Sequence, residues 1–138
     1  MPKFSDASKK KLATCHEDLQ TLFNEVIKYY DCTIVEGYRD KFTQDLYYSL
    51  GKSKVKYPNG KHNANPSEAV DAVSYESNGT DWSDKQAIYF AGYVKGMADR
   101  LYEEGKMKYR IRGGADWNMN NDINDQTFND YCHFELKK

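Results

Sequence analysis

The stretch Asp130-Tyr131-Cys132-His133-Phe134-Glu135-Leu136 alternates between polar and apolar side chains with a period of two residues. Because successive side chains of a β-strand point to opposite faces, this pattern predicts a strand. One face would pack into the core and carries the apolar side chains of Cys132, Phe134 and Leu136. The other face would line a polar site and carries Tyr131, His133 and Glu135. Asp130 stands at the mouth of the strand, three residues before His133.

A second polar cluster lies far upstream, in His62-Asn63-Ala64-Asn65-Pro66-Ser67-Glu68-Ala69-Val70-Asp71. Together with His133, its residues His62 and Asp71 supply two imidazoles and one carboxylate. A catalytic zinc site uses three such protein ligands and keeps a fourth position for water. Zinc lowers the pKa of that water to about 7, and a nearby carboxylate must then take the proton. Asp130 is the candidate for this base, because it is not needed as a ligand.

The alternative interpretation is that His62 and His133 are unrelated polar residues. Two observations favour the site. His133 alternates against an apolar face, and the strand predicted after His62 carries Asp71.

Length and composition indicate a soluble protein with one domain, spanning residues 1–138. The formal net charge of −1 gives no global field that would attract nucleic acid or an anionic membrane. The three cysteines are odd in number and lack a short repeated spacing, so we expect small buried hydrophobic residues and no disulfide framework. The N-terminus has no apolar segment of the signal-peptide type, and no run is long enough to span a membrane. We therefore expect a monomer made in the cytosol, without stable membrane association.

Hydrophobic periodicity and turn residues predict three helices and four strands. The helices are expected over Ser8–Tyr30, over Asp40–Leu50, and from Ser83 to a stop at Gly105. The strands are expected over Cys32–Tyr38, Glu68–Tyr75, Lys108–Arg112 and Asp130–Leu136. The segments Gly51–Pro66 and Gly113–Thr127 are expected to be loops, and Glu76–Trp82 a turn.

Several local details accompany this assignment. Ser83 and Gln86 form a capping-box pattern at the start of the last helix. Its buried stripe is predicted to be Ile88, Ala91, Val94, Ala98 and Leu101. His16 lies beside the apolar stripe of the first helix and is interpreted as a surface histidine. Because no helix separates the last two strands, the order favours an α+β fold with a small, mostly antiparallel sheet covered by helices.

The loop before the last strand carries oxygen side chains at alternate positions, namely Asp116, Asn118, Asn120 and Asp122. Calcium prefers several oxygen ligands, so this loop is a candidate calcium site. It lacks the central glycine and the final glutamate of an EF-hand loop. The favoured alternative is a solvated loop held by Asx turns at the rim of the site.

Four blocks of the chain resemble zinc-dependent peptidoglycan peptidases of the D-alanyl-D-alanine carboxypeptidase and L-alanyl-D-glutamate endopeptidase type. The blocks are Thr33–Arg39, Lys61–Asp71, Gly113–Asn118 and Asp130–Leu136. The chain looks most like the small phage endolysins of the endopeptidase branch. The resemblance implies the fold of the hedgehog and D,D-peptidase group. It also implies zinc ligation by His62, Asp71 and His133, catalysis by Asp130, and binding of an oxyanion or substrate carboxylate by Arg39. A surface salt bridge is the alternative role for Arg39.

Two departures from the carboxypeptidases bear on the substrate. Those enzymes carry a serine where this chain has Gly60, and they space the first histidine and the aspartate more closely than His62 and Asp71 are spaced here. Gly60 removes one hydrogen bond that could orient a ligand, and Glu135, on the face of His133, is the candidate for that support.

The sequence therefore predicts an endolysin that hydrolyses the L-alanyl-D-glutamate bond of peptidoglycan stems. It would accumulate in the host cytosol and act on the cell wall at lysis. The alternatives are a D-alanyl-D-alanine carboxypeptidase or dipeptidase on the same scaffold, and an inactive zinc-bearing domain that binds the wall. A pure binder would have no need for Asp130 beside the metal.

Overall fold

The computed structural model describes residues 2–138. Its helices are α1 (Asp6–Leu12), α2 (Glu17–Val26), α3 (Lys41–Ser49) and α4 (Asp84–Glu103), with a short 3-10 helix η1 (Lys61–Asn63). Its strands are β1 (Cys32–Glu36), β2 (Ala69–Glu76), β3 (Gly79–Asp81), β4 (Arg110–Gly114) and β5 (Asp130–Lys137). None of the described helices is long and apolar enough to cross a membrane.

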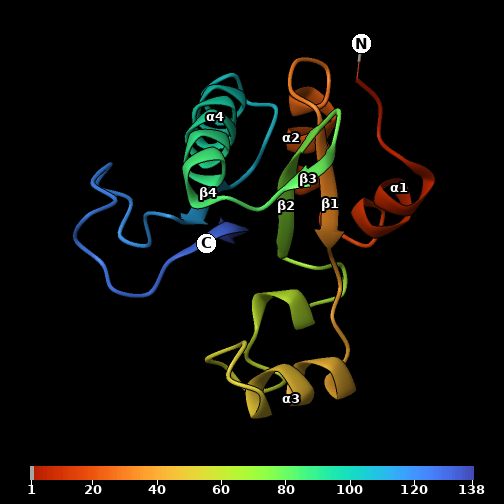
Figure 1. Ribbon diagram of the computed structural model, residues 1–138, viewed down its shortest axis with the longest axis vertical. Helices are drawn as coiled ribbons and strands as arrows, with labels where there is room; N and C mark the ends of the chain where they lie inside the picture. The colour runs from red at the N-terminus through yellow and green to blue at the C-terminus, as the bar shows by residue number, and fades with distance from the viewer. Residues whose placement is uncertain (1) are drawn as a thin grey trace.

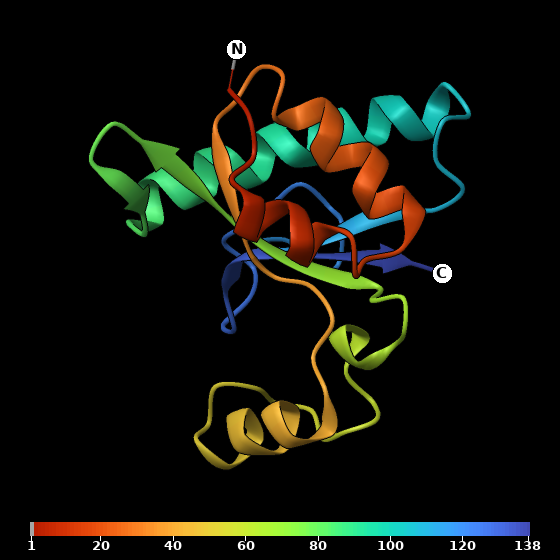
Figure 2. The same cartoon turned by 90° about the vertical axis from the view of Figure 1, so that its right-hand side faces the viewer.

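The strands form one sheet in the order β1-β2-β5-β4, and β3 pairs with β2. All of these pairings are antiparallel, which confirms the predicted α+β class. Helices α1, α2 and α4 lie on one side of the sheet, and α3 with its following loop lies on the other (Figures 1 and 2). Phe134 of β5 is central to the core, where its ring meets Phe23 of α2 and Phe90 of α4 edge-on.

The predicted first helix is two helices, because the chain turns at residues 13–16. The backbone there pairs with the segment before β2: His16 N donates to Ser67 O (2.8 Å), and Ser67 N donates to Thr14 O (2.9 Å). His16 is not a free surface residue, since its half-buried ring caps α2 by accepting a hydrogen bond from Asp18 N. This joint anchors the chain just before the strand that carries Asp71.

Strand β5 keeps the predicted alternation only in its second half. Gly113 of β4 pairs with Phe134, but the next residue, Gly114, pairs with Asp130, so β5 carries a bulge between these positions. Beyond the bulge, side chains alternate between core and site as predicted. Within it the faces are exchanged: Tyr131 packs against the core, and Cys132 lines the cleft on the other side of the sheet. A bulge adds residues to one strand and thereby re-aims the side chains around it.

The cysteine prediction holds for two residues and fails for the third. Cys15 and Cys32 are buried in the core, and burial raises the pKa of their thiols to about 11 and about 12. Cys132 is only half-buried, because the bulge turns it toward the cleft.

Four smaller differences concern α4 and the segments beside it. Ser83 Oγ accepts from Gln86 N, but the side chain of Gln86 donates to Tyr30 Oη instead of closing the capping box. Phe90, and not Ile88, begins the buried stripe of the helix. Strand β4 starts two residues later than predicted, and the predicted turn contains the short strand β3.

Candidate metal centre and cleft

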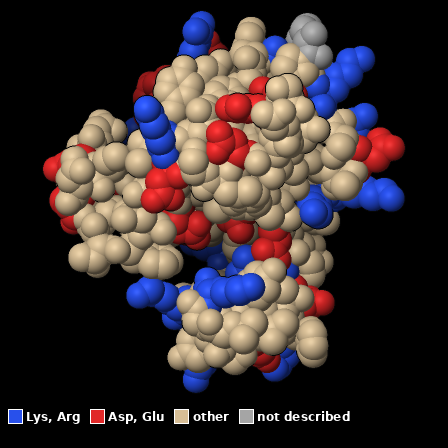
Figure 3. Space-filling view, viewed as in Figure 1, with Lys and Arg blue, Asp and Glu red and all other residues tan. Residues whose placement is uncertain are grey.

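A cleft of about 670 Å³ lies between α3 with its following loop and the open face of the sheet. Figure 3 shows this hollow, with Lys and Arg side chains along its lower edge and Asp and Glu side chains along its upper edge. Every predicted metal-binding, catalytic and supporting residue lines it: Arg39, His62, Asp71, Asp130, His133 and Glu135. Residues from distant parts of the sequence therefore meet on one surface.

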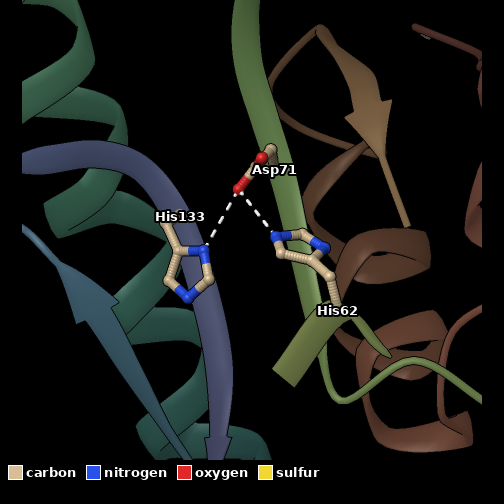
Figure 4. A group of neighbouring side chains, drawn as sticks. All are labelled: His62, Asp71 and His133. Carbon is tan, nitrogen blue, oxygen red and sulfur yellow. Dashed lines mark hydrogen bonds and ion pairs between the residues drawn. The ribbon is translucent and has the colours of Figure 1, made fainter. Parts of the chain in front are cut away.

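The two histidines converge on one carboxylate oxygen. Asp71 Oδ1 lies 3.3 Å from His62 Nε2 and 3.2 Å from His133 Nδ1, as Figure 4 shows. Asp71 and His133 are direct partners across the β2–β5 pair, and His62 comes from η1. The three ligand atoms lie within 4.8 Å of one another, and no other such group of His, Cys, Asp or Glu occurs in residues 2–138.

The donor set fits a bound cation. His62 Nδ1 lies 2.7 Å from Gly37 O, so this nitrogen must carry a proton to form the hydrogen bond. In a neutral imidazole the opposite nitrogen, Nε2, is then an acceptor that faces a carboxylate oxygen. This Nε2 is buried and has no hydrogen-bond partner among the described residues. A divalent cation would satisfy both acceptors, and two imidazoles with one carboxylate are ligands that zinc accepts.

His133 is held from its far side by Glu135, whose Oε1 lies 2.8 Å from His133 Nε2. Burial alone would lower the pKa of His133, but Asp71 and Glu135 outweigh it and raise the pKa to about 9. Burial alone would raise the pKa of Asp71, but its contacts with His133 and His62 hold it well below its usual range. Asp71 therefore stays ionised between the two histidines, and a metal ion that binds there would displace a proton from His133.

Asp130 lines the cleft and is not part of the three-residue cluster. Burial, and secondarily the charge of Asp71, raises the pKa of its carboxyl group above the usual value. A base works best when its pKa approaches the working pH, so this shift suits proton transfer. Glycine at position 114 lets the backbone of Asp130 pack closely against β4, because a Cβ atom at residue 114 would collide with the backbone oxygen of Asp130.

Arg39 is buried, and the salt bridge that the alternative interpretation expects at the surface is present as a largely buried pair with Glu36. Its Nε and Nη2 atoms donate to the two oxygens of Glu36 at 3.0 and 2.7 Å, and Nη1 donates to Gln44. Nη2 also lies 3.7 Å from Asp71 Oδ2, and the guanidinium stacks over Tyr47. Arg39 thus holds the oxygen of Asp71 that does not face the histidines.

The loop between β4 and β5 is built from Asx turns, as the favoured interpretation predicts. Asp116 accepts from the backbone of Asn120 and Asn121, while the side-chain amides of Asn118 and Asn120 donate to Asp125. Asp122 accepts from Asn124 N. The loop also places Trp117 in the cleft, where its ring stacks on Phe128. Calcium binding to this loop stays a prediction.

Sequence patterns missed the residues that support the ligands. Gly37 belongs to the first quoted block, but nothing in the sequence shows that its carbonyl faces His62. Arg112 and Lys61 contact Glu135 from β4 and η1, at 2.8 and 3.9 Å. Only the strand register and the course of the loops reveal these contacts.

A family model described as phage L-alanyl-D-glutamate peptidase matches residues 1–137. The chain belongs to this family. The peptidase is 32% identical over 127 residues to the L-alanyl-D-glutamate peptidase of Escherichia phage T5, with 90% of this chain and 88% of that relative covered. Its fold matches the crystal structure of the Serratia marcescens L-Ala D-Glu endopeptidase ChiX, with a TM-score of 0.73 and 20% identity, over 98% of this chain and 90% of that one. The predicted family, a peptidoglycan peptidase of the endolysin type, is confirmed.

Proposed function

We propose that this peptidase is a zinc enzyme that hydrolyses the L-alanyl-D-glutamate bond of bacterial peptidoglycan, and that residues 1–138 act as one catalytic domain. The proposal of a metal rests on the unpartnered Nε2 of buried His62, which faces a carboxylate oxygen. The proposal of the cleaved bond rests on membership of the family and on the activity named for the phage T5 relative. That activity favours the endopeptidase over the carboxypeptidase alternative.

His62 Nε2, Asp71 Oδ1 and His133 Nδ1 would hold the ion. When bound, zinc would lower the pKa of a water molecule and polarise the scissile carbonyl. Asp130 would take a proton from the attacking water as the water oxygen bonds to the carbonyl carbon of the substrate. The C–N bond would then break, and Asp130 would return the proton to the leaving amine. The raised pKa of Asp130 suits both transfers.

Arg39 would act mainly by orienting Asp71. Most of its donors are engaged by Glu36 and Gln44, and its contact with Asp71 Oδ2 leaves Oδ1 directed at the histidines. Binding of an oxyanion or a substrate carboxylate by Arg39 stays a prediction.

The remaining properties follow from the family and from the sequence. We propose that the enzyme acts as a monomer, without a nucleic-acid partner or stable membrane association. It would reside in the host cytoplasm until lysis and then reach the cell wall. Calcium is proposed as a second ion, for the loop at the rim of the cleft.

Digestion of purified peptidoglycan tests the activity. Mass analysis of the fragments should show new N-terminal D-glutamate and new C-terminal L-alanine. Release of free D-alanine would instead identify the carboxypeptidase, and zinc binding without fragments would identify the inactive binding domain.

A further inference from the structure

A closed ring of contacts surrounds the side of His133 that faces away from Asp71. His133 Nε2 lies 2.8 Å from Glu135 Oε1, and Glu135 Oε2 lies 2.8 Å from Arg112 Nη2. The Arg112 guanidinium stacks 5.6 Å from the Trp117 ring, and that ring lies 5.5 Å from the ring of His133. Each of the four side chains touches the next one.

The geometry points to Arg112 as a positioning residue: we propose that Arg112 and Trp117 clamp His133, through Glu135, in its metal-binding orientation. This inference rests on the proposed zinc site. A histidine that ligates through Nδ1 must carry its proton on Nε2, and an acceptor there fixes both the tautomer and the ring angle. Glu135 is that acceptor, so whatever fixes Glu135 also fixes His133.

Glu135 needs help to stay in place, because it is 5% exposed. A buried carboxylate is unfavourable unless cations or hydrogen bonds compensate for the lost water. Arg112 supplies the near contact, and Lys61 Nζ lies at 3.9 Å. Arg112 and Glu135 are also direct partners across the β4–β5 pair, so the sheet itself sets their approach.

The position of Arg112 is not explained by the stability of β4. Its Nε atom is buried and has no hydrogen-bond partner among the described residues. An unpaired buried donor is unfavourable, so this placement of Arg112 does not favour the stability of the strand. The stack on Trp117 holds the guanidinium there. Trp117 is in turn fixed by two hydrogen bonds, from its backbone N to Gln126 and from Nε1 to Phe128 O, each 2.9 Å long.

The inference gives the loop between β4 and β5 a part in the site. Gln126 bonds to Trp117, to Gly114 O at the end of β4, and to Asn129 just before β5, so it ties the two ends of the loop together. The loop thereby keeps Trp117 against His133. A disturbance of the loop would reach the metal ligand through this ring.

The test compares Arg112→Gln with the control Arg110→Gln. Arg110 lies two residues away on the same strand, pairs with Asp99 and stacks on Tyr102, and does not contact Glu135. Zinc affinity is measured in the full-length protein by competition with a chelator. Loss of a side chain that hydrogen-bonds a metal ligand typically weakens metal binding by about ten- to a hundredfold. Because Arg112 acts on His133 through Glu135, we expect a loss of up to this size for Arg112→Gln and none for Arg110→Gln. Arg112→Lys, which retains the charge but not the planar fork, should fall in between.

Two further readouts separate positioning from other roles. In cobalt-substituted protein, Arg112→Gln should change the visible absorption of the metal, which a loss of stability alone would leave unchanged. On a Glu135→Gln background, Arg112→Gln should add little further loss of affinity, because the two residues act through one path.

Several results would overturn the inference. One is a folded Arg112→Gln protein with wild-type zinc affinity and an unchanged cobalt spectrum. Another is a raised KM with unchanged metal affinity, which would make Arg112 a substrate ligand. If Arg112→Gln does not fold, a wild-type zinc affinity in Arg112→Lys would overturn the inference in the same way. A wild-type protein that binds no zinc would instead contradict the proposed function itself.

Discussion

The carbonyl oxygen of Gly37 lies 2.7 Å from Nδ1 of His62, and this contact turns Nε2 of the same ring toward Asp71. Gly37 follows the end of β1, where the chain passes directly against the end of α1. A Cβ atom at this position would collide with Thr14 Oγ1 and Lys11 O and would lie 2.9 Å from Cys15 Sγ. Glycine is therefore required for the close approach that orients His62, the first of the proposed ligands.

Gly37→Ala should accordingly weaken both the fold and the metal site. Forcing extra atoms into a packed interior typically costs about 1–3 kcal/mol, and the displaced carbonyl would no longer fix the ring of His62. Chemical denaturation and zinc titration measure the two effects. Gly92→Ala is the matched control, because a Cβ atom there meets nothing within 4 Å. Unchanged zinc affinity in Gly37→Ala would show that His62 is oriented by other contacts.

Asp18 offers a change that should affect stability but not the site. Its buried carboxylate accepts from the backbone nitrogens of Lys108 and Tyr109, both at 2.9 Å. Asp18→Ala would leave two donors without a partner just before β4, at a cost of about 2–4 kcal/mol in the free energy of unfolding. Thermal unfolding measures this loss. Below the melting temperature, zinc content and turnover should stay at wild-type levels, and a fall in either would link this contact to the site.

The ligand set predicts that His133→Ala loses zinc. Removal of one of three protein ligands leaves His62 and Asp71, which are too few to retain the ion against a chelator. Metal analysis after dialysis measures the zinc bound per chain. The control His16→Ala removes a histidine that caps α2 and should retain one zinc. Stoichiometric zinc in His133→Ala would remove His133 from the ligand set.

The loop between β4 and β5 provides a separate test with calcium. Its alternating oxygens predict that calcium at millimolar concentration binds between Asp116 and Asp125 and orders the edge of the cleft. Calorimetric titration of the zinc-loaded protein should then show heat, and Asp125→Asn should abolish it. Absence of heat, with unchanged activity, would leave the Asx turns as the full account of this loop.

The sequence brought forward residues that the structure places together in one cleft, because each of them stands in a strong local pattern. Alternation placed His133 and Glu135 on one face of β5, and the quoted blocks identified His62, Asp71 and Asp130. The bulge in β5 could not be predicted, because it depends on how Gly113 and Gly114 pair with the neighbouring strand. It exchanged the faces of Tyr131 and Cys132.

The break in the first predicted helix was missed for a related reason. Residues 8–30 carry a continuous helical stripe, but the backbone of residues 14–16 pairs with Ser67, a contact distant in sequence. Arg112 was likewise predicted only as the last residue of a strand, because its pairing with Glu135 depends on the register between β4 and β5. Local periodicity determines the elements, whereas the supports of the site come from pairings between them.

The most direct test of the account is the turnover of peptidoglycan by Asp130→Asn. Asparagine nearly preserves the shape of the side chain but cannot accept the proton of the attacking water. General acid–base assistance is typically worth about a hundred- to ten-thousandfold, so turnover should fall within this range while zinc content and folding are retained. A zinc-loaded, folded Asp130→Asn protein with near wild-type turnover would contradict the proposed mechanism and would direct the search for the base to Glu135.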